Sequence, residues 1–118
     1  MRRLELILKI RWYEMIASGE KKEEYREIKP YWIKRLCFTL KDNPYIHCKT
    51  ENCCSECFSE AGEEWTAFPF EVVRFRRGYS KTTMDFEIRE ISIGKGNPEW
   101  GAVAYEDYFI IKLGKRIN

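Results

Sequence analysis

The sequence predicts a mostly β fold of the α+β class, a small β-barrel with short helices at its rim. Several short segments alternate apolar with polar residues, which is typical of half-buried strands. Two other short segments carry helix signals, and short strands with a few helices around one core favour a small barrel. The 118 residues are enough for one modest core, so we expect a single domain over residues 1–118.

The N-terminal segment predicts a strand followed by a helix. Apolar and polar residues alternate over residues 4–10, which indicates a half-buried first strand. Trp12, Met15 and Ile16 then recur at helical spacing. Gly19 stands where such a helix would end in a left-handed cap.

The next segment, residues 22–28, predicts a strand whose two faces are both partly charged. Because alternate side chains of a strand point to opposite faces, Glu24 and Arg26 share one face, and Tyr25 lies on the other. An acid and a base side by side are more typical of a cleft than of a core. Lys21, at the turn before the strand, is placed to bend toward the same cleft.

These three charged residues suit contact with a nucleic acid or chemistry upon it. Arg26 fits bidentate contact with phosphate. Glu24 is able to accept from a base amino group or to act as a general base. Lys21 is able to neutralise phosphate or to transfer protons. The residues do not choose between binding RNA and cutting it.

The middle of the chain predicts a second helix, an insert and a strand that ends in a turn. Pro30 is suited to open a short helix, since proline is tolerated in a first turn. Residues 41–62 form a Cys-rich insert without periodicity, and such long connections are usually functional or variable. Residues 68–77 predict a strand, and residues 76–80 a turn.

A later strand changes phase part of the way along. Met84, Phe86 and Ile88 share one face, but the apolar residues beyond them fall on the other. Either a bulge re-aims the strand near Arg89, or Glu90 points inward with the three apolar residues. Both alternatives make Glu90 a candidate site acid.

The C-terminal part predicts a loop and a closing strand. Residues 94–101 form a glycine-rich loop, and residues 108–113 an apolar strand that we expect to be central. Three candidate ligand contacts are Trp100 in this loop and Arg77 and Tyr79 in the turn at residues 76–80. On proteins that bind single-stranded nucleic acid, the bases stack on aromatic rings and basic side chains contact the phosphates.

The insert holds a compact group of possible metal ligands. Its cysteines are spaced closely enough for a closed tetrahedral zinc site, with His47 nearby. The alternative is a set of reduced thiols on a variable loop. The candidate zinc ligands are Cys48, Cys53, Cys54 and Cys57.

Composition narrows the function classes. The net charge is +2, so bulk charge does not argue for nucleic-acid binding, and any electrostatic footprint has to be local. No apolar run is long enough to span a membrane, and the basic start does not lead into a signal peptide. We therefore expect a cytoplasmic protein without a membrane partner, whose cysteines are reduced or metal-bound.

Four positions early in the chain follow the pattern G-x-K-x-x-E-x-R: Gly19, Lys21, Glu24 and Arg26. This pattern resembles the signature of the ASCH domain, a branch of the PUA-like β-barrels. Residues 77–79, 93–94 and 98–101 are also similar to segments of the small ASCH proteins of bacteria and their phages. The resemblance covers nearly the whole chain apart from the Cys-rich insert.

The resemblance implies a PUA-like barrel whose cleft holds RNA or a nucleotide-like ligand. It also implies an alternative, a small hydrolase acting on RNA or on a modified nucleoside. For such an enzyme the candidate catalytic residues of this chain are Lys21 and Glu24, with Glu90 in reserve. The amidohydrolase branch of the family uses a Lys and a Thr. Here Glu24 occupies the Thr position, which removes the presumed nucleophile. A third alternative is a protein-interaction module that uses the Cys-rich loop.

Overall fold

The computed structural model describes residues 2–36 and 69–118. The chain forms two compact units, Met1–Tyr25 with Phe70–Asn118, and Arg26–Pro69. The Cys-rich insert, with its four candidate zinc ligands, lies outside the described residues. The zinc site therefore stays a prediction.

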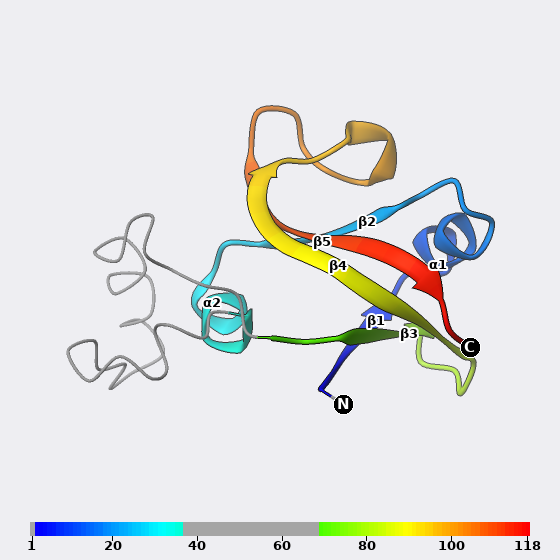
Figure 1. Ribbon diagram of the computed structural model, residues 1–118. Helices are drawn as coiled ribbons and strands as arrows, with labels where there is room; N and C mark the ends of the chain where they lie inside the picture. Colours follow the sequence, from blue (N-terminus) through cyan, green and yellow to red (C-terminus); the bar gives the residue numbers. More distant parts are fainter. Residues whose placement is uncertain (1, 37–68) are drawn as a thin grey trace. The chain divides into compact units, whose positions relative to one another are not determined.

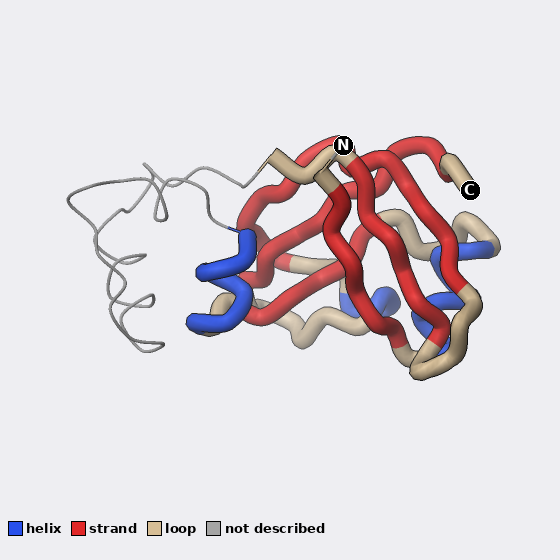
Figure 2. Tube along the Cα trace, turned by 90° about the horizontal axis from the view of Figure 1, so that it is seen from below, coloured by secondary structure: helices blue, strands red, loops and turns tan. Residues whose placement is uncertain are grey.

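The first unit is built on one mixed sheet that curls into a half-barrel, which confirms the mostly β prediction (Figures 1 and 2). Its strand order is β1-β3-β4-β5-β2, with β1 parallel to β3 and antiparallel pairing from β3 to β5. The strands are β1 (Arg3–Leu8), β2 (Glu23–Glu27), β3 (Val72–Arg77), β4 (Thr83–Lys95) and β5 (Asp107–Arg116). The last of these is an interior strand, as expected, although β4 holds the middle of the sheet.

Helix α1 (Ile10–Ala17) corrects the predicted extent of the first strand. The strand ends at Leu8, whose carbonyl accepts from the Gly78 backbone N–H, and Ile10 opens the helix with half of its side chain exposed. The alternation through Ile10 was therefore wrong at its last position. As predicted, the helix ends before Gly19, which has a φ of 86°.

The core of the first unit lies between α1 and the inner face of the sheet. Strand β1 buries every second residue, Leu4, Leu6 and Leu8, as the period of a strand requires. The buried residues with the least exposure include Leu4, Val73, Phe75, Met84, Phe109 and Ile111. Strand β5 is also covered on its other face, where Tyr108 and Ile110 pack with Tyr25 and Ala102.

The phase slip in β4 is a bulge. The pairing of β4 with β5 shifts register between Phe86 and Ile88 and again between Ile88 and Glu90. Glu90 is exposed and pairs with Lys112 of β5 at 3.2 Å. The bulge is therefore confirmed, and the alternative in which Glu90 points inward is wrong.

In the second unit, the predicted helix begins at Pro30. Helix α2 spans Pro30–Leu36, and Ile33 and Leu36 are buried. No helix in residues 2–36 or 69–118 is long and apolar enough to cross a membrane.

Candidate functional site

The end of α1 fixes the backbone of Lys21. The Gly19 N–H donates to the Ile16 carbonyl at 3.1 Å, and the Lys21 N–H donates to the Met15 carbonyl at 3.0 Å. This left-handed termination satisfies the last carbonyls of the helix and turns the chain sharply. As a result, the Lys21 ammonium reaches the Trp12 ring of α1.

Lys21 and Glu24 form a buried ion pair. The Nζ of Lys21 lies 2.9 Å from Oε1 of Glu24, and the two side chains are 1% and 4% exposed. The same carboxylate oxygen accepts from the Tyr25 backbone N–H at 3.0 Å. Sequence analysis placed the two residues together correctly. Their burial differs from the open cleft that it predicted.

Aromatic rings surround this ion pair. The Lys21 ammonium lies 4.6 Å from the ring centroid of Trp12 and 5.7 Å from that of Tyr25. The guanidinium of Arg11 lies 4.7 Å from the same Trp12 ring. We call Arg11, Trp12, Lys21, Glu24 and Tyr25 the Trp12 cluster. Because Trp12 is only partly buried and Arg11 is exposed, the cluster reaches the surface at these two residues.

The loop between β4 and β5 packs onto the Trp12 cluster. It contains the 3₁₀ helix η2 (Pro98–Trp100), which Asn97 caps by accepting from the Glu99 N–H. A Cβ on Gly101 would lie 3.0 Å from Cζ2 of Trp12, so the loop backbone lies directly against the indole. Trp100, a predicted ligand contact, is partly buried and packs against the apolar group formed by Tyr25, Ala102, Tyr108 and Ile110.

The hydroxyl of Tyr25 connects β2 to this loop. It donates to the Glu23 carboxylate at 2.8 Å and accepts from the Asn97 backbone N–H at 2.9 Å. Burial raises the pKa of this hydroxyl above its ordinary value, and the hydrogen bond to Glu23 raises it further. The phenol therefore keeps its proton and both bonds at physiological pH.

Arg26, the last residue of the predicted motif, belongs to the second compact unit. Its guanidinium lies 5.3 Å from the ring centroid of Trp32, and that of Arg35 lies 5.5 Å from the same ring. Tyr31 meets Trp32 edge-on. This unit therefore has an aromatic ring with two cations of its own.

The structure does not join the two turn candidates to the Trp12 cluster. Arg77, at the end of β3, is bound by Glu14 of α1 through Nε and Oε1 at 2.8 Å. Tyr79, in the turn between β3 and β4, is 95% exposed. Glu90 lies on the exposed part of β4 described above.

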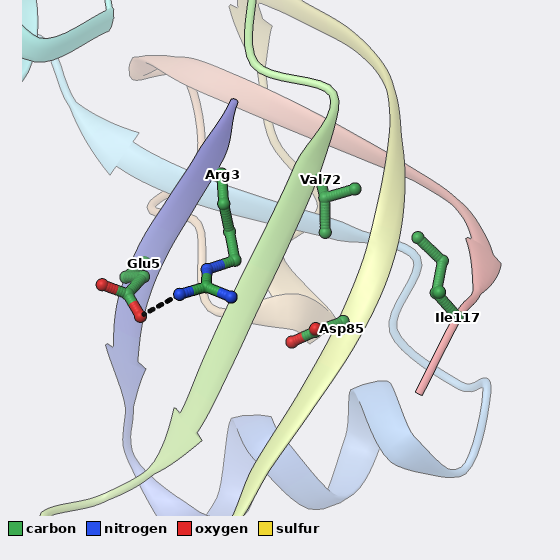
Figure 3. Close-up of a pocket in the computed structure, with 5 residues that line it drawn as sticks. All are labelled: Arg3, Glu5, Val72, Asp85 and Ile117. Atoms are coloured by element: carbon green, nitrogen blue, oxygen red, sulfur yellow. Dashed lines mark hydrogen bonds and ion pairs between the residues drawn. The ribbon is translucent and has the colours of Figure 1, made fainter. Parts of the chain in front are cut away.

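A separate hollow of about 400 Å³ lies on the outer face of the sheet (Figure 3). Its lining consists of Arg3, Glu5, Val72, Asp85 and Ile117. The charges there are paired, because Arg3 meets Glu5 at 3.4 Å and Asp85 takes two bonds from Arg74, at 2.7 and 2.9 Å. This balance gives the hollow little selectivity for an anionic ligand.

Asp85 makes the stability of the fold sensitive to acid. The hydrogen bonds from Arg74 lower the pKa of this carboxyl below its ordinary value of 3.8, although burial opposes them. Its stabilising contribution is therefore complete above about pH 3.8 and is lost as the pH falls toward the lowered pKa. We expect Asp85→Asn to lose stability at pH 7 and to show a weaker decline between pH 5 and pH 2, measured by urea unfolding. Equal pH dependence in both proteins would contradict this assignment.

Among residues 2–36 and 69–118, no group of three or more His, Cys, Asp or Glu side chains is arranged to hold a metal ion. Sequence analysis missed the part that Arg11 and Gly101 have in the site. The only available signal was the glycine-rich composition of residues 94–101. Comparison with protein-family models, with curated proteins and with solved structures finds no match to this chain.

Proposed function

We propose that this chain is an RNA- or nucleotide-binding domain of the ASCH type, and that the Trp12 cluster is its ligand site. The observation that carries the proposal is the partly exposed Trp12 ring with the exposed Arg11 guanidinium 4.7 Å from its centroid. Proteins that bind single strands combine aromatic rings for the bases with cations for the phosphates. In the second unit, the Trp32 ring likewise has guanidinium groups beside it, those of Arg26 and Arg35.

The buried pair supports this role by holding the site in shape. Lys21 lies in the turn after α1 and Glu24 in β2, and the Lys21 ammonium also lies 4.6 Å from the Trp12 ring, so the pair holds the turn between the elements that carry Trp12 and Tyr25. A preformed ring loses little conformational entropy when a base stacks on it. The net charge of +2 agrees with a local footprint of a few phosphates.

A hydrolase acting on RNA or on a modified nucleoside is the second candidate. The observation in its favour is the 2.9 Å contact of the Lys21 ammonium with the Glu24 carboxylate, a couple able to exchange a proton. We favour binding because side chains that are 1% and 4% exposed offer a substrate almost no contact surface.

The test is RNA affinity measured over a range of salt concentrations. We expect Arg11→Gln to weaken binding of single-stranded RNA and to reduce the slope of log K against log salt by about 0.7, the value for one phosphate contact. Trp12→Leu should weaken binding about tenfold or more with little change in that slope.

The matched control is Arg3→Gln, which removes the same charge from an exposed arginine on the outer face of the sheet. It should leave both affinity and slope near wild type. Equal effects of the two arginine variants would contradict the proposal that RNA binds at the Trp12 cluster. Cleavage of the RNA in these incubations would favour the hydrolase. So would deacetylation of acetylcytidine, a modified nucleoside, in a parallel incubation.

A further inference from the structure

Tyr105 has an unusual backbone conformation for a bulky residue. Its φ is 67°, and it is the only non-glycine residue with a positive φ in the described parts of the chain. Its side chain is 92% exposed, so burial of the ring does not compensate for the strain. Residues in such sparsely populated backbone conformations cluster at active sites and ligand contacts, where the surrounding structure holds them in place.

Tyr108 holds the backbone on both sides of Tyr105. Its hydroxyl, on a buried ring of β5, accepts from the Val103 N–H at 2.9 Å and donates to the Glu106 carboxylate at 3.1 Å. The Glu106 N–H in turn donates to the Val103 carbonyl at 3.3 Å. The chain on each side of Tyr105 is therefore fixed, and the exposed ring is presented from a rigid base.

The same loop carries Tyr105 and contacts the proposed ligand site. Gly101 lies against Trp12, and Tyr105 follows four residues later. The two acidic residues that follow Tyr105 in sequence are engaged by the adjoining strands, since Glu106 accepts from Tyr108 of β5 and Asp107 pairs with Lys95 of β4. An aromatic face with its neighbouring acids paired is suited to a base, because stacking requires only a ring.

We propose that Tyr105 stacks on a second unpaired base of a single-stranded RNA whose first base lies at Trp12. The inference rests on the proposed function and deepens it, because it makes the ligand an oligonucleotide. A mononucleotide fills the Trp12 position alone, whereas a longer strand contacts both rings.

The test compares the binding of uridine monophosphate and of a six-nucleotide oligouridylate to the full chain. Tyr105→Asn removes the ring, and asparagine tolerates a positive φ, so the variant should fold with an unchanged or higher melting temperature. We expect it to lose about tenfold or more in affinity for the oligonucleotide and nothing for the mononucleotide. Tyr105→Trp should keep the oligonucleotide affinity, because it keeps a ring.

The outcomes separate this inference from the function on which it rests. If the oligonucleotide binds, Trp12→Leu weakens it and Tyr105→Asn does not, then the role of Tyr105 is overturned and the proposed function stands. An equal loss for both ligands in Tyr105→Asn would also overturn it, because the residue would then act on the first position. If wild type binds neither ligand, the proposed function fails, and the assignment of Tyr105 fails with it.

Discussion

Replacing Lys21 by methionine is expected to lower the free energy of unfolding by about 3–5 kcal/mol, the range for breaking a buried ion pair. The variant keeps much of the shape of the side chain but removes the ammonium that lies 2.9 Å from the Glu24 carboxylate. A carboxylate that is 4% exposed gains little from water when that ammonium is lost. Urea unfolding followed by circular dichroism measures the loss.

Two further variants test whether the burial of the ion pair causes the predicted loss of stability in Lys21→Met. Lys112→Met removes an ammonium from the pair with Glu90, whose side chains are 43% and 57% exposed, and should cost less than about 1 kcal/mol. The double variant Lys21→Met/Glu24→Leu removes both charges and should recover most of the loss. A Lys21→Met protein no less stable than Lys112→Met would refute the buried pair as a structural tie.

Replacing Gly96 by alanine is expected to cost about 1–3 kcal/mol through overpacking. A Cβ at this position would lie 2.5 Å from the Cβ of Ala102 and 2.9 Å from Cζ of Tyr25. Neither atom is the end of a flexible side chain, so the loop or β2 has to move. Such a movement would also strain the bond from the Asn97 N–H to the Tyr25 hydroxyl. The measurement is the midpoint of urea unfolding.

Gly94→Ala is the matched control, two residues earlier in β4. Its Cβ would lie 3.5 Å from Cδ1 of Ile110, which is ordinary van der Waals contact. Neither Gly94 nor Gly96 has a positive φ. The two variants therefore differ in the room available to the new Cβ and not in backbone strain. We expect Gly94→Ala to stay within about 1 kcal/mol of wild type. Equal losses at both positions would exclude the close approach at Gly96 as the cause.

The predictable parts of the fold are those that local sequence determines. Gly19 marks the end of α1 because only a residue at ease with positive φ terminates a helix in this way. Pro30 marks the start of α2 because its lost N–H is not needed in a first turn. The break in alternation after Ile88 likewise located the irregularity of β4, although the sequence alone left open whether a bulge or an inward Glu90 caused it.

The remaining features depend on contacts between distant segments. Ile10 continues the alternation of β1 but belongs to α1, because β1 stops at Leu8, which pairs with the last residue of β3 and accepts from the Gly78 N–H in the turn after it. The candidate pair Lys21 and Glu24 was found from a short motif, but its burial depends on α1 and on the loop beyond β4. Nothing in the sequence near Tyr105 indicates its backbone angle, which follows from the hydroxyl of Tyr108.

The strand order has a consequence for how the chain reaches its native state during synthesis. In the sheet of the first unit, β1 pairs with β3 and β2 lies beside β5, so both strands have partners that are synthesised much later than they are. The strands β3, β4 and β5 are local neighbours in sequence, and local pairs close with the smaller loss of chain entropy. Strands β1 and β2 and helix α1 therefore stay exposed to solvent until the sheet of β3, β4 and β5 has formed. Lys21 can be buried only after β5 and the loop before it have been synthesised.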